Sequence, residues 1–152
     1  MTLLSGGASE TEPGGRQNPM KILPENWPAT FGGRLGMTYL EVSPGSAVAE
    51  FRVGPEHRNP PGVCHGGAIF TFADDAMGAA IHALCPPGTV PTSAQVSINY
   101  ARSTQPGDLL RAEAKVLSRG QTTAVLEVRV EDTEGRLVAL VSGSYLFVQA
   151  RA

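Results

Sequence analysis

A histidine and two glycines, His65, Gly66 and Gly67, directly precede the most apolar stretch of the chain. Glycines at the start of a helix leave the backbone N–H groups accessible to a ligand. Those N–H groups lie at the positive end of the helix dipole, where they can stabilise negative charge that develops on a carbonyl oxygen. The pattern therefore favours a site at which backbone amides stabilise an oxyanion.

Asp74 adds a carboxylate to this predicted helix. It follows Gly67 by seven residues, which is about two helical turns, so the two residues lie on nearly the same face. Burying an unpaired charge costs free energy, so a carboxylate inside an apolar helix needs a reason, which is either catalysis or a structural hydrogen bond to the backbone. The neighbouring Asp75 points about 100° away, and we expect it to meet another partner, such as a backbone N–H.

The rest of the chain predicts a sheet around this helix. The segment 66–84 is apolar nearly all round, and a helix of that kind is buried on every face. Alternating apolar and polar residues predict strands at 36–42, 47–53, 92–101, 109–117, 126–131 and 136–149. A single antiparallel sheet must then curl around one long central helix. This is an α+β arrangement, the hot-dog fold.

Length and composition indicate one domain and exclude a nucleic-acid-binding protein. The 152 residues fit one domain, which we place at 21–152 after a polar tail at 1–20 that we expect to be disordered. Charged residues are 17% of the chain and the net charge is −2 without a Lys/Arg cluster, so we expect no nucleic-acid partner.

The cysteines and the apolar stretch predict where the protein resides. Cys64 and Cys85 flank the helix, about 30 Å apart, which is beyond disulfide reach, so we expect reduced thiols and a cytoplasmic protein. The N-terminal residues show no charged segment followed by an apolar one, so we expect no signal peptide. Asp74 and Asp75 would each cost about 2.5–3.5 kcal/mol at a bilayer midplane, which argues against a membrane span.

The region around His65 also resembles a known family. Asn59 lies six residues before the His65-Gly-Gly motif, an acidic residue lies nine positions after the histidine, and Gly78 follows. Together with the Ser93 region and a hairpin at 132–135, this pattern resembles the hot-dog acyl-CoA thioesterases of the phenylacetate-degradation (PaaI-like) type. The resemblance spans roughly residues 34–148.

The resemblance implies an acyl-CoA thioesterase that releases a free acid and CoA without a metal or redox cofactor. It implies a homo-oligomer, a dimer or tetramer, whose active sites lie across the dimer interface. Asn59, His65 and Gly66 would come from one chain and hold the substrate or water, with the Gly66 N–H polarising the thioester carbonyl. Asp74 from the other chain would act as nucleophile or general base, and Ser93 would orient it or the water.

CoA carries phosphates, so basic residues are expected near the mouth of the site. Arg102 and Arg119 are candidates, with Thr122 as a weaker hydrogen-bonding partner and Gly67 beside the substrate; a solvated surface role is the alternative for each arginine. The acyl pocket would be lined by Phe70, Phe72, Met77 and Tyr100.

Other functions remain open at this point. The same chemistry could act on an acyl carrier protein. A hot-dog hydratase or dehydratase would require a catalytic histidine deep in the helix, where this chain has Asp74, and a non-catalytic acyl-CoA-binding protein would not require a buried carboxylate. Cys64 and His65 are adjacent and so poorly placed for a nucleophilic dyad, and the histidines lack metal-ligand spacing. The sequence does not distinguish aryl from aliphatic acyl groups.

Overall fold

The structure is a computed structural model that describes residues 26–151. The tail expected at 1–20 therefore lies outside the described residues. The described part begins with two short helices, η2 (Trp27–Ala29) and α1 (Phe31–Leu35). The side chain of Thr30 accepts a hydrogen bond from the Gly33 N–H and caps α1, and Gly36 ends it with a φ of 81°, a conformation that favours glycine.

Six antiparallel strands form one sheet in the order β1-β2-β4-β5-β6-β3. Their bounds are β1 (Met37–Ser43), β2 (Ser46–Arg52), β3 (Thr89–Tyr100), β4 (Leu109–Arg119), β5 (Thr123–Asp132) and β6 (Leu137–Gln149). The six predicted strands are confirmed, although β3 and β5 each begin three residues earlier than expected. The last strand, β6, pairs on both sides, whereas β1 and β3 are the edges of the sheet.

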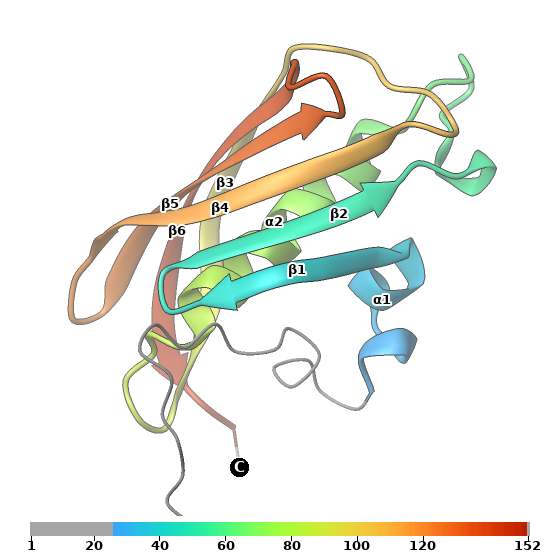
Figure 1. The fold of residues 1–152 in the computed structure, drawn as a ribbon. Helices are drawn as coiled ribbons and strands as arrows, with labels where there is room; N and C mark the ends of the chain where they lie inside the picture. The colour runs from blue at the N-terminus through green and yellow to red at the C-terminus, as the bar shows by residue number, and fades with distance from the viewer. Residues whose placement is uncertain (1–25, 152) are drawn as a thin grey trace, which may run out of the picture.

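The helix α2 (Gly66–His82) lies against the inner face of this curled sheet (Figure 1). The predicted α+β fold, a curled antiparallel sheet around one long helix, is confirmed. Irregular pairing at four places, including Ser93/Gln95 in β3 and Val116/Ser118 in β4, helps the strands to bend, because bulges increase local twist. A 3-10 helix, η3 (Pro55–His57), and an irregular loop connect β2 to α2.

The expectation that α2 is buried on every face was wrong. Its buried positions are Ile69, Phe72, Ala73, Ala76, Met77, Ala80 and Ile81, which point toward the sheet. On the other side, Phe70, Asp74 and Gly78 are only partly buried, because six strands of one chain cover one side of the helix. Among residues 26–151, no helix is long and apolar enough to cross a membrane.

Candidate active site

The first turn of α2 presents one amide that has no partner. His65 is the N-cap residue, and its Nδ1 accepts a hydrogen bond of 2.8 Å from the Gly67 N–H. Its carbonyl oxygen accepts another, of 2.9 Å, from the Ala68 N–H. Within residues 26–151, the Gly66 N–H has no acceptor. Gly66 therefore offers a free donor at the positive end of the helix dipole.

The loop before α2 is held in place by backbone hydrogen bonds, one within the loop and one to the segment between β3 and β4. The Cys64 N–H donates to the carbonyl of Thr104, and the His65 N–H donates to that of His57. Asn59 closes the turn, because its Oδ1 accepts from the Val63 N–H at 3.2 Å. Within the chain, Asn59 therefore shapes the loop through its side-chain oxygen. Its side-chain NH2 donates no hydrogen bond among the described residues.

The two glycines accommodate aromatic rings of the same chain. A Cβ added at Gly66 would lie 2.8 Å from the hydroxyl oxygen of Tyr100, and one added at Gly67 would lie 2.9 Å from Nδ1 of His65. The sequence interpretation, that the glycines leave their N–H groups accessible to a ligand, therefore applies only to Gly66. The Gly67 N–H is taken by His65, whereas the Gly66 N–H has no acceptor among the described residues.

Asp74 is held by a tyrosine that the sequence analysis did not identify. The hydroxyl of Tyr145 in β6 donates to Oδ1 of Asp74 at 2.6 Å. Burial, followed by this hydrogen bond, raises the pKa of Tyr145, so the phenol remains a proton donor. The inward position of a tyrosine on the last strand is the signal that could have revealed it, because a buried phenol needs a polar partner.

Ser93 lies directly opposite Tyr145 in the register of β3 and β6. Residues opposite each other in an antiparallel pair project to the same face of the sheet, so Ser93 lies on the face that bears the Tyr145 side chain. The group of Asp74, Tyr145 and Ser93 is therefore joined by one hydrogen bond and by strand register, and no hydrogen bond joins Ser93 to Asp74 among the described residues. Gly66 is not part of this group, because eight helical residues place it about 12 Å from Asp74 along the axis.

Asp75 does not have the hydrogen bond that was expected. Its Oδ2 is buried without a hydrogen-bond partner among the described residues. A Cβ added at Gly32 of α1 would clash with this oxygen. Burial, and secondarily the charge of Asp74, raises the pKa of Asp75 to about 6. Asp75 is therefore a carboxylate packed against Gly32 of α1 with one oxygen that has no hydrogen-bond partner among the described residues.

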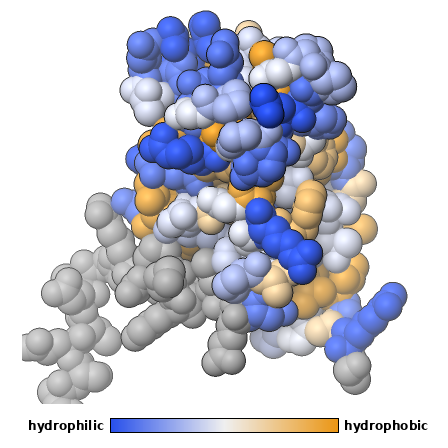
Figure 2. Space-filling view, turned by 90° about the vertical axis from the view of Figure 1, so that its right-hand side faces the viewer, coloured by the Kyte–Doolittle hydropathy of each residue, from blue (hydrophilic) through white to orange (hydrophobic). Residues whose placement is uncertain are grey.

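Two cavities flank the start of α2. One, of about 360 Å³, is lined by Gly66, Tyr100 and Arg102 among others. The second, of about 610 Å³, is lined by Phe31, Leu35 and Phe70 beside His65 and Gly67. This end of the molecule faces the viewer in Figure 2, where apolar surface lies between hydrophilic residues.

Two residues expected in the acyl pocket lie in the core instead. Phe72 and Met77 are 0% exposed. The ring of Phe72 packs at 5.5 Å from that of Phe51, and Met77 packs on Gly143. Both point toward the sheet side of α2, whereas Phe70 and Tyr100 do line the cavities.

The CoA-binding candidates separate within one chain. Arg102 lines the cavity beside Gly66. Arg119 lies at the other end of α2, where its Nη2 donates to the Leu84 carbonyl at 3.0 Å and its guanidinium covers the Phe147 ring. The carbonyl of Thr122 accepts from the Phe147 N–H, so Thr122 belongs to that distant end as well.

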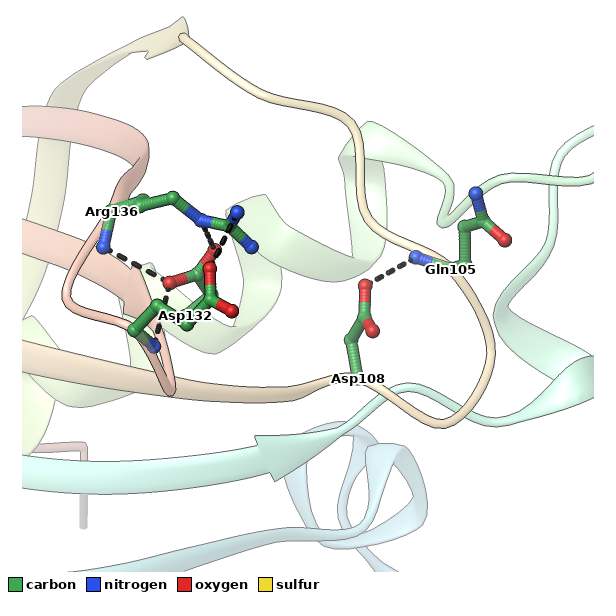
Figure 3. A network of polar contacts seen from close by, with 5 residues as sticks. Gln105, Asp108, Asp132 and Arg136 are labelled. Atoms are coloured by element: carbon green, nitrogen blue, oxygen red, sulfur yellow. Dashed lines mark hydrogen bonds and ion pairs between the residues drawn. The ribbon is translucent and has the colours of Figure 1, made fainter.

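A polar network at the tip of the β5–β6 hairpin is structural. Asp132 accepts hydrogen bonds from the Glu134 and Arg136 amides and from the Arg136 guanidinium at 2.7 Å, as Figure 3 shows. Nearby, Asp108 accepts from the Gln105 N–H. These contacts close two turns. Among residues 26–151, no group of His, Cys, Asp and Glu side chains could hold a metal ion.

Comparison with known proteins gives consistent matches. The family model for the Thioesterase superfamily matches residues 61–139. The acyl-coenzyme A thioesterase PaaI of Escherichia coli is 29% identical over 109 residues, 72% of this chain and 76% of the relative. Human acyl-coenzyme A thioesterase 13 is 30% identical over 105 residues, 68% of this chain and 74% of the relative.

The fold also matches solved structures. The structure of Escherichia coli PaaI aligns with a TM-score of 0.73 at 27% identity, covering 78% of this chain and 84% of that one. A hypothetical thioesterase from Streptococcus pneumoniae, solved with coenzyme A, aligns with a TM-score of 0.70 at 27% identity, covering 76% and 91%.

Proposed function

The chain belongs to the Thioesterase superfamily, and from that premise we propose that it hydrolyses acyl-CoA thioesters to a free acid and CoA. The resemblance to PaaI-like hot-dog thioesterases is confirmed by the family match and by the alignment with PaaI. The assignment of acyl-CoA as substrate is supported by the names of these relatives and by the coenzyme A in the Streptococcus pneumoniae structure.

The observation that carries the proposal is the placement of Asp74. Tyr145 occupies its Oδ1, and its Oδ2 has no partner among the described residues. In the proposed reaction, Oδ2 either attacks the thioester carbonyl, forming a mixed anhydride on Asp74 that a water molecule then hydrolyses to the free acid, or removes a proton from a water molecule that attacks the carbonyl directly. The Gly66 N–H stabilises the oxyanion, the C–S bond breaks, and the CoA sulfur leaves as a thiolate that takes up a proton. Ser93 orients the carboxylate or the water.

The site is proposed to be shared between two copies of the chain. Gly66 and Asp74 of one chain are too far apart to act on the same carbonyl. The exposed edge of β3 and the partly exposed side of α2 offer a second copy a surface to cover. In such a dimer, Gly66, His65 and Asn59 of one protomer face Asp74 and Ser93 of its partner. A tetramer would be built from two such dimers.

Substrate contacts follow from the cavities. The apolar cavity beside Gly67 and Phe70 is the proposed acyl pocket. Arg102 beside Gly66 is the proposed phosphate partner of CoA. Arg119 and Thr122 could contact the same CoA only from the partner protomer.

The two free thiols, Cys64 and Cys85, support a reducing, cytoplasmic location.

Release of free thiol from a panel of aryl-CoA and alkyl-CoA thioesters tests the activity. The same acyl groups on an acyl carrier protein serve as the comparison. We expect turnover of CoA thioesters, and the preferred acyl length identifies the substrate class. If no thioester in the panel is hydrolysed above the rate in buffer, the proposed activity is wrong.

Mixing two inactive variants tests the shared site. Asp74→Asn inactivates one half of each site and Gly66→Val the other. After subunit exchange, random pairing makes half of the dimers mixed, and each mixed dimer has one intact site, so about a quarter of the wild-type activity should return. If each site lies within one chain, the mixture remains inactive.

A further inference from the structure

The peptide group between Gly66 and Gly67 is held from both ends. Its carbonyl oxygen accepts a hydrogen bond of 2.7 Å from the hydroxyl of Tyr100, at the end of β3. Its amide, the Gly67 N–H, donates a hydrogen bond of 2.8 Å to Nδ1 of His65. Each ring also fills the space that a side chain would occupy at the glycine it covers. The two rings and the two glycines therefore form one unit.

We propose that Tyr100 is a positioning residue: with His65 it fixes the Gly66–Gly67 peptide group, so that the Gly66 N–H is the amide presented to the thioester carbonyl. This inference rests on the proposed thioesterase function. Tyr100 itself need not contact the substrate.

Glycine flexibility is the reason that such a device is needed. Two consecutive glycines have more backbone freedom than any other pair, and a donor that moves loses the advantage of preorganisation. The His65 carbonyl, which shares a peptide group with the Gly66 N–H, is fixed by the Ala68 amide. Tyr100 and His65 fix the next peptide group, so both backbone dihedrals of Gly66 are constrained.

The same contacts select between the two candidate donors. The Gly67 N–H is occupied by His65, whereas the Gly66 N–H is free within the described part of the chain. His65 can accept this bond only when Nδ1 carries no proton. Its role in this unit is that of an acceptor that caps the helix.

Tyr100→Phe is the test, because it removes the hydroxyl and keeps the ring over Gly66. We expect kcat to fall about tenfold, with KM changed less than about threefold, because the lost bond affects the oxyanion donor. Tyr39→Phe is the matched control. Tyr39 also donates its hydroxyl to a carbonyl of α2, that of Asp75 at 2.8 Å, but far from the first turn. The kcat of Tyr39→Phe should stay within about twofold of the wild-type value.

Hydrogen exchange of the Gly67 amide in 15N-labelled protein gives a readout that does not depend on activity. In Tyr100→Phe this exchange should accelerate about fivefold or more, since the peptide group is released at its carbonyl end. If Tyr100→Phe leaves the exchange rate of the Gly67 amide unchanged, the proposal is overturned, whatever the effect of this substitution on kcat. Faster exchange with unchanged kcat would overturn the positioning role. If wild type hydrolyses no thioester, the proposed function fails, and the exchange data alone decide whether the peptide group is held.

A double-mutant cycle with His65 completes the test. His65→Ala removes the acceptor, whereas His65→Asn retains a side-chain oxygen suited to an N-cap. We expect His65→Asn to recover most of the kcat lost in His65→Ala. The losses of Tyr100→Phe and His65→Ala should also be less than multiplicative, because both residues hold one peptide group. Fully multiplicative losses would show that the two residues act independently.

Discussion

Tyr145 donates a hydrogen bond of 2.6 Å to Oδ1 of Asp74, joining strand β6 to the middle of helix α2. The same hydroxyl lies 3.2 Å from the Asp74 carbonyl oxygen. Tyr145 itself is 4% exposed, so this phenol is part of the core and has little freedom to move. The contact fixes the carboxylate rotamer and leaves one oxygen for chemistry.

Tyr145→Phe should therefore lower activity without unfolding the protein. A hydrogen bond to a charged group contributes about 1.5–3 kcal/mol, so the rate should fall about 10-fold to 100-fold if the bond persists in the transition state. We expect the loss in kcat and little change in KM, measured by thiol release from the best CoA thioester. Equal turnover by the two proteins would mean that Tyr145 only anchors the strand.

Asp74→Asn should abolish turnover, whereas Asp75→Asn should not. The amide has nearly the shape of the carboxylate but can act neither as nucleophile nor as base, so we expect kcat to fall about 10³-fold, or about 4 kcal/mol. Asp75 packs against Gly32 of α1 and is not hydrogen-bonded to Tyr145, so Asp75→Asn should retain most of the rate. An inactive Asp75→Asn beside an active Asp74→Asn would reverse the assignment.

Periodicity predicted the architecture well and the surroundings of the helix less well. Alternation in the strands and the apolar run at 66–84 were sufficient for a curled sheet around one helix. Composition cannot show that one chain covers only one side of that helix. Phe72 and Met77 were wrongly assigned to a pocket, because an apolar residue has the same sequence signature in a core as in a cavity.

The site was predictable where a local motif carried it. The His65-Gly-Gly motif correctly indicated a helix start, and the first amide of that helix has no acceptor among the described residues. A buried tyrosine such as Tyr145 signals that it needs a polar partner, but the partners of Tyr100 and Tyr145 could not be identified, because they lie 34 and 71 residues away in the chain. Such contacts depend on strand register, which the order of residues does not fix alone.

Gly66→Ala should reduce turnover more than stability. The added Cβ would lie 2.8 Å from the Tyr100 hydroxyl oxygen and 2.9 Å from Cζ, so the ring must move and release the Gly66 carbonyl. We expect kcat to fall about 10-fold to 100-fold. Thermal unfolding and kcat of the variant and of wild type make the comparison, and equal rates would exclude crowding at Gly66.

Asp75 should make the protein less stable as pH rises toward neutrality. Its pKa in the folded protein is about 6, raised by burial and then by Asp74, whereas an unfolded aspartate has a pKa of about 3.9. Between about pH 4 and 6 the folded state therefore binds more protons than the unfolded state, so the free energy of unfolding falls as pH increases. Because the side chain is partly exposed, we expect a loss of about 1 kcal/mol by pH 7.

Asp75→Asn should remove this dependence. At pH 7.5 the variant should be about 1 kcal/mol more stable than wild type, with a melting temperature about 2–4 °C higher, because no buried charge is formed. At pH 4 the difference should nearly vanish. Asp74→Asn should show a smaller gain in the same direction, since it removes only the secondary cause of the raised pKa. Calorimetry at fixed protein concentration measures all three proteins, because a dimer's melting temperature depends on concentration. A variant that is less stable than wild type at pH 7.5 would mean that the Asp75 carboxylate is paired in solution.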